Sequence, residues 1–213
     1  MSFTRPRAWF VRVLAAVLVL CAQCTLGQVT EPGLFLVAKP SILDPNFSGT
    51  VILVTGAPDG ASIGVILNRP TKESLASILP GNDLVAKFTD PLYFGGPVER
   101  VGLFAVFRSK DTPGQTLPVV EDVQLALNPE TVEKLLRNPP VQVRFFVGYS
   151  GWAPGQLSAE LERGDWWTVN AEPDTVFRKN TDTLWDELSR RARAVTASAP
   201  PRAIRVMRSC VDC

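Results

Sequence analysis

The stretch whose residue types are best suited to binding runs over residues 148–167, with the sequence GYSGWAPGQLSAELERGDWW. Its three glycines before residue 156 give the backbone conformations that other residues avoid. Free backbone amides at a helix start, with the Gln156 side chain beside them, bind anionic or polar groups. The same glycines also let Trp152 pack and a helix dock closely on a sheet, and we favour this packing role. The candidate binding residues of this stretch are Gly151, Trp152, Gly155 and Gln156.

Two other turns carry residues that suit a binding site. Asn68 tolerates unusual backbone angles at the end of a β-rich run. Arg69, which follows it, either pairs with an anion or is a solvated strand end. Gly95 and Gly96 stand before a proline at another strand end, where they permit the close approach of a second backbone segment or a ligand. We expect these two turns and residues 151–156 to converge at one end of a sheet.

Most familiar catalytic machinery is missing from the sequence. The 213 residues contain no histidine, which removes Ser-His-Asp and Cys-His mechanisms and zinc hydrolases that use imidazole. Neither a P-loop nor a dinucleotide-binding or nucleophile-elbow motif occurs. The carboxylates of Asp44, Glu99, Glu160 and Asp165 remain as acids or bases, but no spacing places two of them at a working distance. We therefore assign no catalytic residue and expect no cofactor.

A pair of thiols ends the chain, at Cys210 and Cys213. In an oxidising compartment two such thiols can close a small disulfide loop. A redox role needs a flanking helix and a βαβ context, which this segment lacks. A zinc site needs two more ligands, and residues 28–209 contain neither Cys nor His. We favour an incidental disulfide or a free tail, and expect no metal.

The first 27 residues resemble a secretory signal peptide. They contain three arginines and no acid, then ten apolar residues at 13–22, too few to span a bilayer, and then Thr25-Leu26-Gly27. A lipoprotein signal is the alternative because Cys21 and Cys24 are near. However, the residues before these cysteines are Leu and Gln, where a small residue is needed. We expect cleavage, a periplasmic or secreted protein, and membrane contact only through the transient signal.

Charge argues against a nucleic acid partner. The chain has 22 basic and 21 acidic residues. Three of the basic residues lie in the expected signal peptide, so residues 28–213 contain 19 basic and 21 acidic residues, a net charge of −2. Nucleic acid binding asks for a concentrated basic face. The arginines near the C-terminal end are better explained as a solvated helix end and tail.

The elements that must position the candidate turns follow from apolar periodicity and breaker residues. Predicted strands cover residues 34–38, 51–55, 62–68, 102–108, 123–127, 141–147, 166–170 and 174–177. Predicted helices cover residues 72–79, 129–137, 154–163 and 182–194, and residues 110–120 have the composition of a loop. In the third helix, Leu157 and Leu161 form an apolar face, whereas Glu160, Glu162 and Arg163 are expected to face water. These elements predict one domain over residues 28–195 and a flexible tail over residues 196–213.

Four blocks of this sequence, in the correct order, resemble the YqgE/AlgH family of bacterial proteins. They are the Leu43-Asp44-Pro45 turn with Phe47, the segment from Gly64 to Pro70, the segment PLYFGGPV at 91–98, and the stretch at 148–167. Family members usually carry a Cys-Glu-His sequence where this chain has Val54-Thr55-Gly56, and often a histidine where it has Phe107. This chain therefore cannot carry out an activity that depends on those Cys, Glu or His side chains.

The resemblance implies an α+β fold: a single domain with a large mixed, mostly antiparallel sheet, partly closed on itself, and about four flanking helices. With no nucleophile–base pair, we expect a non-catalytic exported protein that binds another protein or a small polar ligand. Two alternatives stay open. Some family members are described as transcriptional regulators, which the leader and the acidic charge oppose, and a carboxylate-based hydrolase is the other.

Overall fold

The computed structural model describes residues 33–198. The expected signal peptide over residues 1–27 and the cysteine pair Cys210 and Cys213 lie outside the described residues, and both stay predictions. The tail expected from residue 196 begins within the last turn of the C-terminal helix, which ends at Ser198. The rest of that tail also lies outside the described residues.

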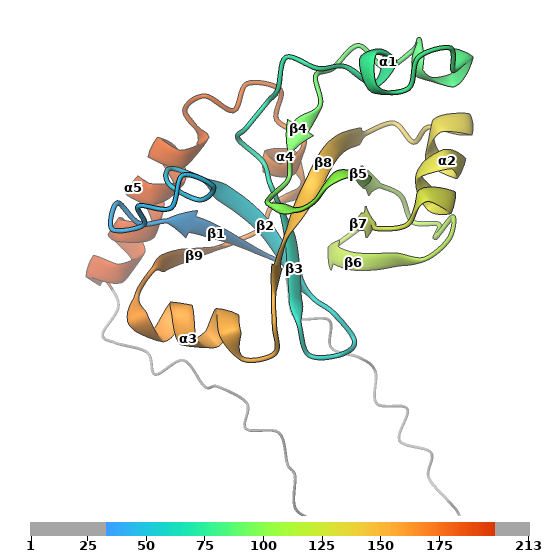
Figure 1. The fold of residues 1–213 in the computed structure, drawn as a ribbon. Coiled ribbons are helices and arrows are strands. Elements are labelled where there is room, and N and C mark those ends of the chain that lie inside the picture. The colour runs from blue at the N-terminus through green and yellow to red at the C-terminus, as the bar shows by residue number, and fades with distance from the viewer. Residues whose placement is uncertain (1–32, 199–213) are drawn as a thin grey trace, which may run out of the picture.

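Nine strands form one sheet within residues 33–198 (Figure 1). They are β1 (Leu34–Ala38), β2 (Val51–Gly56), β3 (Ser62–Ile66), β4 (Tyr93–Phe94), β5 (Val98–Arg108), β6 (Thr116–Val120), β7 (Val123–Ala126), β8 (Val143–Trp152) and β9 (Trp166–Asn170). Their order across the sheet is β6-β7-β5-β8-β3-β2-β1-β9, and β4 pairs with β8. Of the strand pairs in the described part of the chain, β4–β8 is parallel and the others are antiparallel. The α+β fold with a mixed, mostly antiparallel sheet is confirmed.

The sheet curls until its β6 edge reaches β1 and β2. The backbone N–H of Gly33, just before β1, donates to the carbonyl of Val119 at 2.8 Å. The Thr55 hydroxyl on β2 donates to the carbonyl of Pro118 at 2.8 Å. Alternate residues of each strand therefore point to an inner and an outer face. The inner face carries the largest core, which draws residues from both halves of the sheet.

Five α-helices and one 3-10 helix accompany the sheet within the described residues. They are α1 (Leu75–Ile78), η1 (Asp83–Val85), α2 (Pro129–Arg137), α3 (Gln156–Arg163), α4 (Pro173–Val176) and α5 (Leu184–Ser198). Helices α4 and α5 add to the inner core. Helix α2, with α1 and η1, covers the outer face of β5, β7 and β8, and α3 covers the outer face of β1, β2 and β3 (Figure 1).

Local sequence signals fixed several of these elements as expected. The β2–β3 hairpin forms around the predicted turn. Helix α2 begins after Asn128, whose side-chain oxygen accepts the Thr131 N–H at 2.7 Å, and Pro129 occupies its first turn. Strand β9 and the left-handed Gly164 that ends α3 also match the prediction.

The strand over residues 141–147 was expected to end at Gly148, and that boundary is wrong. Strand β8 continues to Trp152, with Gly151 opposite Ile63 of β3. Gly148 adopts a φ of 69° within the strand, where a side chain would overlap the carbonyl of Gly96. Its lack of a Cβ lets β8 bend past that neighbouring segment. Helix α3 consequently begins at Gln156, two residues later than predicted.

Three other elements differ from the sequence prediction. The supposed loop at 110–120 contains β6, because an edge strand tolerates Pro118, whose missing N–H is not needed there. Residues 174–177 belong largely to helix α4, which starts at Pro173, instead of a strand. Helix α1 is only one turn long because the capping box starts at Ser74, not at Thr71.

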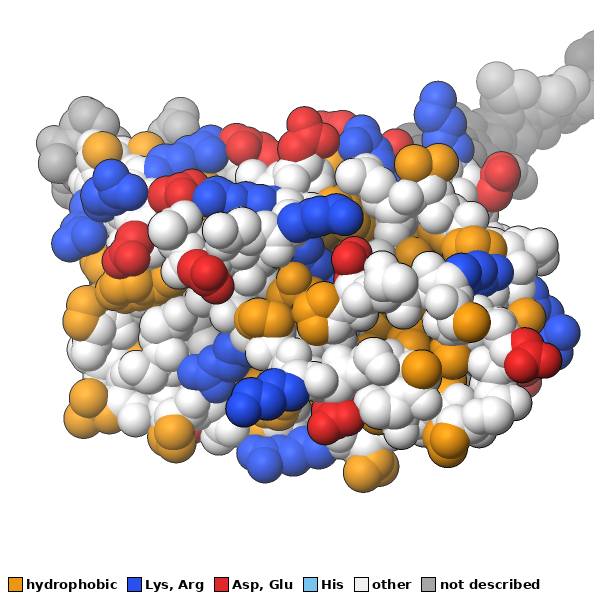
Figure 2. Space-filling model, turned by 90° about the horizontal axis from the view of Figure 1, so that it is seen from above, with side chains coloured by type: hydrophobic (Ala, Val, Ile, Leu, Met, Phe, Trp, Pro, Cys, Tyr) orange, Lys and Arg blue, Asp and Glu red, His pale blue; other side chains and the backbone are white. Residues whose placement is uncertain are grey.

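The surface mixes residue types. In the face shown in Figure 2, basic, acidic and hydrophobic side chains are interspersed, and that face holds no continuous basic area. Among residues 33–198, none of the helices has the length and apolar character that a membrane crossing requires.

Candidate functional site

The stretch singled out by the sequence folds around the carboxylate of Glu160. The indole N–H of Trp152 donates to Glu160 Oε2 at 2.8 Å, and the indole N–H of Trp166 donates to the same oxygen at 2.9 Å. The Gln156 amide donates to Glu160 Oε1 at 3.0 Å. The two indoles meet edge to face, with their centroids 6.3 Å apart. Both tryptophans are largely buried, and these bonds give their indole N–H groups partners within the protein.

Three elements bring these side chains together. Trp152 ends β8, Trp166 begins β9, and α3 crosses between them. Gln156 and Glu160 are four residues apart, which places them on one side of α3. Gly155 precedes the helix with a φ of 78°, a conformation that glycine adopts most readily. The Ala153 N–H donates to Gln156 Oε1 at 3.1 Å, which ties the turn to the same network.

A surface hollow of about 290 Å³ opens beside this network, and we call it the tryptophan hollow. The loop between β1 and β2 forms one wall, and α3 with the start of β9 forms the other. Phe47 from the loop contacts Trp166 edge to face at 5.9 Å. The residues that line the hollow are Ile42, Asp44, Phe47, Gly151, Trp152, Gln156, Glu160, Arg163, Asp165 and Trp166.

Three carboxylates and one guanidinium line the tryptophan hollow. The helical pattern predicted that Glu160 faces water, and that expectation is wrong, because one of its oxygens accepts from two buried indoles. Asp44 Oδ1 accepts the backbone N–H of Asn46 at 2.7 Å, and Asp165 pairs with Arg163 at 2.7 Å. Each carboxylate is thus already held by a local donor. The excess of acidic groups favours a cationic or hydrogen-bond-donating ligand over an anionic one.

The role of Glu160 was missed because its tryptophan donors come from two different strands. A helical position with apolar neighbours at Leu157 and Leu161 normally lies at the edge of the buried face. The available signal was the spacing Gln156–Glu160 after Trp152. By itself that spacing does not show that the indole N–H of Trp166 donates to the same carboxylate.

Asn68 and Arg69 stabilise the wall of the hollow instead of lining it. Asn68 Oδ1 accepts the Val51 N–H at 2.9 Å, and its amide donates to the Gly49 carbonyl at 2.9 Å. Arg69 Nη2 donates to the Ser48 carbonyl at 3.0 Å. Burial lowers the pKa of Arg69, and the nearby Asp44 carboxylate offsets part of that effect. Both side chains therefore hold the β1–β2 loop in place.

Gly95 and Gly96 lie where two backbone segments approach closely. The Gly95 carbonyl accepts from the Ile66 N–H at 3.0 Å and from the Ser150 hydroxyl at 3.1 Å. Gly96 has a φ of 152°, and a Cβ there would overlap the carbonyl of Tyr149. These contacts are made by other parts of this chain, so the geometry explains both glycines by packing.

The expected convergence at one end of the sheet does not occur. Trp152 pairs with Ser62 at the start of β3, whereas Asn68 and Arg69 follow the other end of that strand. The structure brings together Gly151, Trp152 and Gln156 and leaves the other candidates outside the tryptophan hollow. Arg69 acts on it only through the β1–β2 loop. Within residues 33–198, no three Cys, Asp or Glu side chains are grouped as metal ligands.

Comparisons with known proteins agree on the family and the fold. The AlgH-like family model (DUF179) matches residues 35–196. The chain is similar to a UPF0301 protein of Streptomyces avermitilis, with 35% identity over 180 residues that cover 79% of this chain and 91% of that protein. It is also similar to a UPF0301 protein of Chlorobaculum tepidum, with 32% identity over 161 residues that cover 74% and 84%.

Two solved structures have similar folds. The solution structure of the AlgH protein from Pseudomonas aeruginosa matches with a TM-score of 0.62 and 25% identity, over 80% of this chain and 95% of that one. The X-ray structure of a Corynebacterium diphtheriae protein matches with a TM-score of 0.62 and 26% identity, over 75% and 86%.

Proposed function

This chain belongs to the AlgH-like family, and we propose that it is a non-catalytic, exported binding protein that takes its partner in the tryptophan hollow. The observation that carries this proposal is the shared hydrogen bonding of Trp152 and Trp166 to Glu160. It fixes two indoles and a carboxylate beside an open depression. A rigid aromatic wall with polar groups at its rim is typical of recognition surfaces.

The chemistry of the hollow supports binding over catalysis. A general acid or base must exchange a proton with the substrate, and a nucleophile needs an activating base. Here Glu160 accepts two indole N–H groups, and Asp165 is paired with Arg163. Histidine, the commonest general base, is absent from the 213 residues.

The partner that fits the hollow presents a cation or several N–H donors next to an apolar group. The lining carries three acids against one base, which gives it an attractive potential for positive charge. Phe47 and the tryptophans supply apolar contact. A lysine-bearing protein segment or a small amine has both features.

Photo-cross-linking in intact cells tests the surface and the compartment together. A photoreactive residue replaces Gln156 at the rim of the hollow, and a second variant carries it at the fully exposed Val101 on β5. We expect an adduct from position 156 and not from position 101, in the extracytoplasmic fraction.

Asp44→Asn should reduce that adduct, and Asp59→Asn is its matched control. Both carboxylates accept a backbone N–H two residues ahead, but only Asp44 lines the hollow. Equal adduct yields from positions 156 and 101 would contradict binding in the hollow. An adduct yield that Asp44→Asn leaves unchanged would also contradict it. Recovery of the protein from the cytosol with residues 1–27 retained would contradict export.

A carboxylate-based hydrolase is the second candidate, and one observation favours it. Of the four carboxylates that the sequence leaves available, Asp44, Glu160 and Asp165 line the same hollow. Purified protein assayed against ester and glycoside panels tests this function. Turnover that Glu160→Gln abolishes, while the protein stays folded, would replace the binding proposal.

A further inference from the structure

A second recessed region lies near the other end of β8 and is built from different residues. It consists of two cavities of about 350 and 220 Å³. Both are lined by Asp90, Pro91, Arg144 and Lys179, and we call the combined region the Arg144 cleft. Arg144 precedes Trp152 by eight residues of β8, or roughly 26 Å along an extended strand. The Arg144 cleft is thus separate from the tryptophan hollow.

Arg144 is a buried cation that makes no ion-pair contact with a carboxylate among residues 33–198. Only 8% of the residue is exposed, and its guanidinium donates to the carbonyls of Val176 at 2.8 Å and Arg178 at 2.5 Å. Its central carbon lies 4.4 Å from the centroid of the Tyr93 ring. Among the described residues it forms no ion pair, and burial lowers its pKa, an effect that Tyr93 and Asp90 partly offset. Buried charges are usually paired, so an anion in direct contact with this guanidinium would be favoured.

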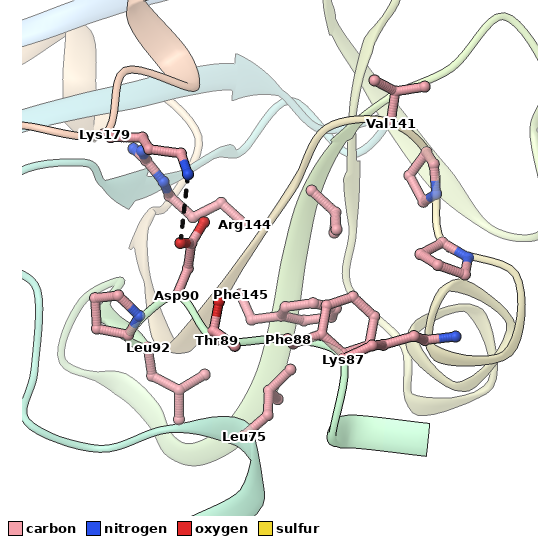
Figure 3. A pocket seen from close by; sticks show the side chains of 14 residues that line it. Leu75, Lys87, Phe88, Thr89, Asp90, Leu92, Val141, Arg144, Phe145 and Lys179 are labelled. Atoms are coloured by element: carbon pink, nitrogen blue, oxygen red, sulfur yellow. Dashed lines mark ion pairs between the residues drawn. The ribbon is translucent and has the colours of Figure 1, made fainter. Parts of the chain in front are cut away.

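Three cations and two carboxylates line the two cavities of the Arg144 cleft: Lys87, Arg144 and Lys179 against Asp90 and Asp182. Lys179 Nζ lies 4.0 Å from Asp90 Oδ1, at the outer limit of an ion pair, and its side chain is mostly exposed. Lys87 lies away from this pair, with its Nζ 5.5 Å from the centroid of the Phe88 ring (Figure 3). In Figure 3, Arg144, Asp90 and Lys179 lie together on one side of the cavity.

Apart from Lys87 and Thr89, the remainder of the larger cavity is lined by apolar side chains. Phe88 and Phe145 meet edge to face with their centroids 5.1 Å apart, and Leu75 lies beside them. Val141 lies on the side away from Lys179 (Figure 3), and Pro139 and Pro140 also line the cavity. The larger cavity therefore combines the Arg144 and Lys179 cations with an aromatic surface. Its volume lies within the usual range for small-molecule sites, about 300–1,000 Å³.

We propose that the Arg144 cleft binds a small organic anion. The anionic group lies between Arg144 and Lys179, and an aromatic or short aliphatic body lies against Phe88 and Phe145. The guanidinium supplies charge-assisted hydrogen bonds, which are strongest to carboxylate and phosphate groups. Such a ligand would give the buried guanidinium an ion-pair contact that residues 33–198 do not supply. This proposal does not depend on a partner in the tryptophan hollow.

Calorimetric titration of the purified protein with three related probes tests the proposal. 4-Phenylbutyrate carries a carboxylate, phenyl phosphate carries a phosphate, and 4-phenylbutanol is the neutral analogue of the first. We expect at least one anion to bind about tenfold or more tightly than the alcohol, because buried guanidinium contacts recognise charge. The tighter of the two anions identifies the head group.

Three variants locate the site. Lys179→Gln, at an exposed position, should weaken anion binding about threefold, whereas Lys110→Gln, an exposed lysine outside the cleft, should leave it unchanged. Phe88→Leu should weaken binding of all three probes about threefold through lost aromatic contact. Because Arg144 also bonds two carbonyls, Arg144→Lys is interpreted only where its circular dichroism matches that of the wild type, and it should then weaken anion binding about tenfold.

Three results would overturn the inference. In the first two, the alcohol binds as tightly as both anions, or neither anion releases or absorbs heat at millimolar concentration. The third is anion affinity that is unchanged in both Lys179→Gln and Phe88→Leu, since neither position carries a buried bond whose loss would unfold the protein.

Discussion

The indole nitrogen of Trp152 lies 2.8 Å from Oε2 of Glu160, across eight residues of chain and the turn between β8 and α3. This bond, with its counterpart from Trp166, joins the end of one strand, a helix and the start of the next strand. It therefore explains why one stretch carries both tryptophans and the acid. The network closes only when all three elements are in place.

Glu160→Gln should lower the free energy of unfolding by about 1–3 kcal/mol, because one carboxylate oxygen serves two buried indole donors and the amide replacement loses its charge. Urea unfolding followed by tryptophan fluorescence measures this change. Ser158→Ala, an exposed change on the same helix, should stay within about 0.5 kcal/mol. A Glu160→Gln variant as stable as wild type would show that the indoles find other partners.

Gly96→Ala should destabilise the fold by about 3 kcal/mol, since a Cβ at its φ of 152° would overlap the backbone of Tyr149. Gly56→Ala is the control, because a Cβ at that glycine meets nothing within 4 Å. Thermal unfolding by circular dichroism compares the two variants. If both behave alike, the close approach of the two segments does not account for Gly96.

Asn68→Ala should cost about 1–2 kcal/mol of unfolding free energy, because it removes the partners of the Val51 N–H and the Gly49 carbonyl. Chemical unfolding measures the loss, with the exposed strand residue Asn170 changed to Ala as the control. Unaltered stability, combined with a lost partner adduct at position 156, would instead give Asn68 a direct binding role.

Glu187→Gln should reduce the amount by which the free energy of unfolding falls on acidification. Hydrogen bonds from Arg178 and Thr183 lower the pKa of Glu187 to about 2. A carboxylate with a lowered folded-state pKa stabilises the protein above its unfolded pKa near 4.5, and this contribution disappears as pH falls towards 2.

Unfolding curves between pH 6 and pH 2 measure this effect. The stability difference between wild type and Glu187→Gln should be greatest near pH 6 and shrink on acidification. Glu162→Gln, a change of an exposed acid on α3, serves as the control. A difference that stays constant with pH would show that the Arg178 pair is not coupled to folding.

Local chemistry in the sequence was enough for much of the fold. The Asn128-Pro129 start of α2, the β2–β3 hairpin and the left-handed Gly164 depend on neighbours within a few residues, and all three are confirmed. The predicted element boundaries are wrong where a segment distant in the sequence pairs with the element. Strand β8 runs past Gly148 because β3 pairs with its last residues, and β6 forms because the curled sheet provides an edge for Pro118.

The sequence by itself determined the family, the α+β class and the absence of histidine chemistry, and it singled out residues 148–167. Only the tertiary structure decided which candidate residues lie together. It separates Arg69 from Trp152 by the length of β3, brings Trp166 to Glu160, and buries Arg144 beside Lys179 with no ion pair among residues 33–198. The reason is physical: composition and periodicity fix local conformation, whereas a binding surface depends on which strands the curled sheet places side by side.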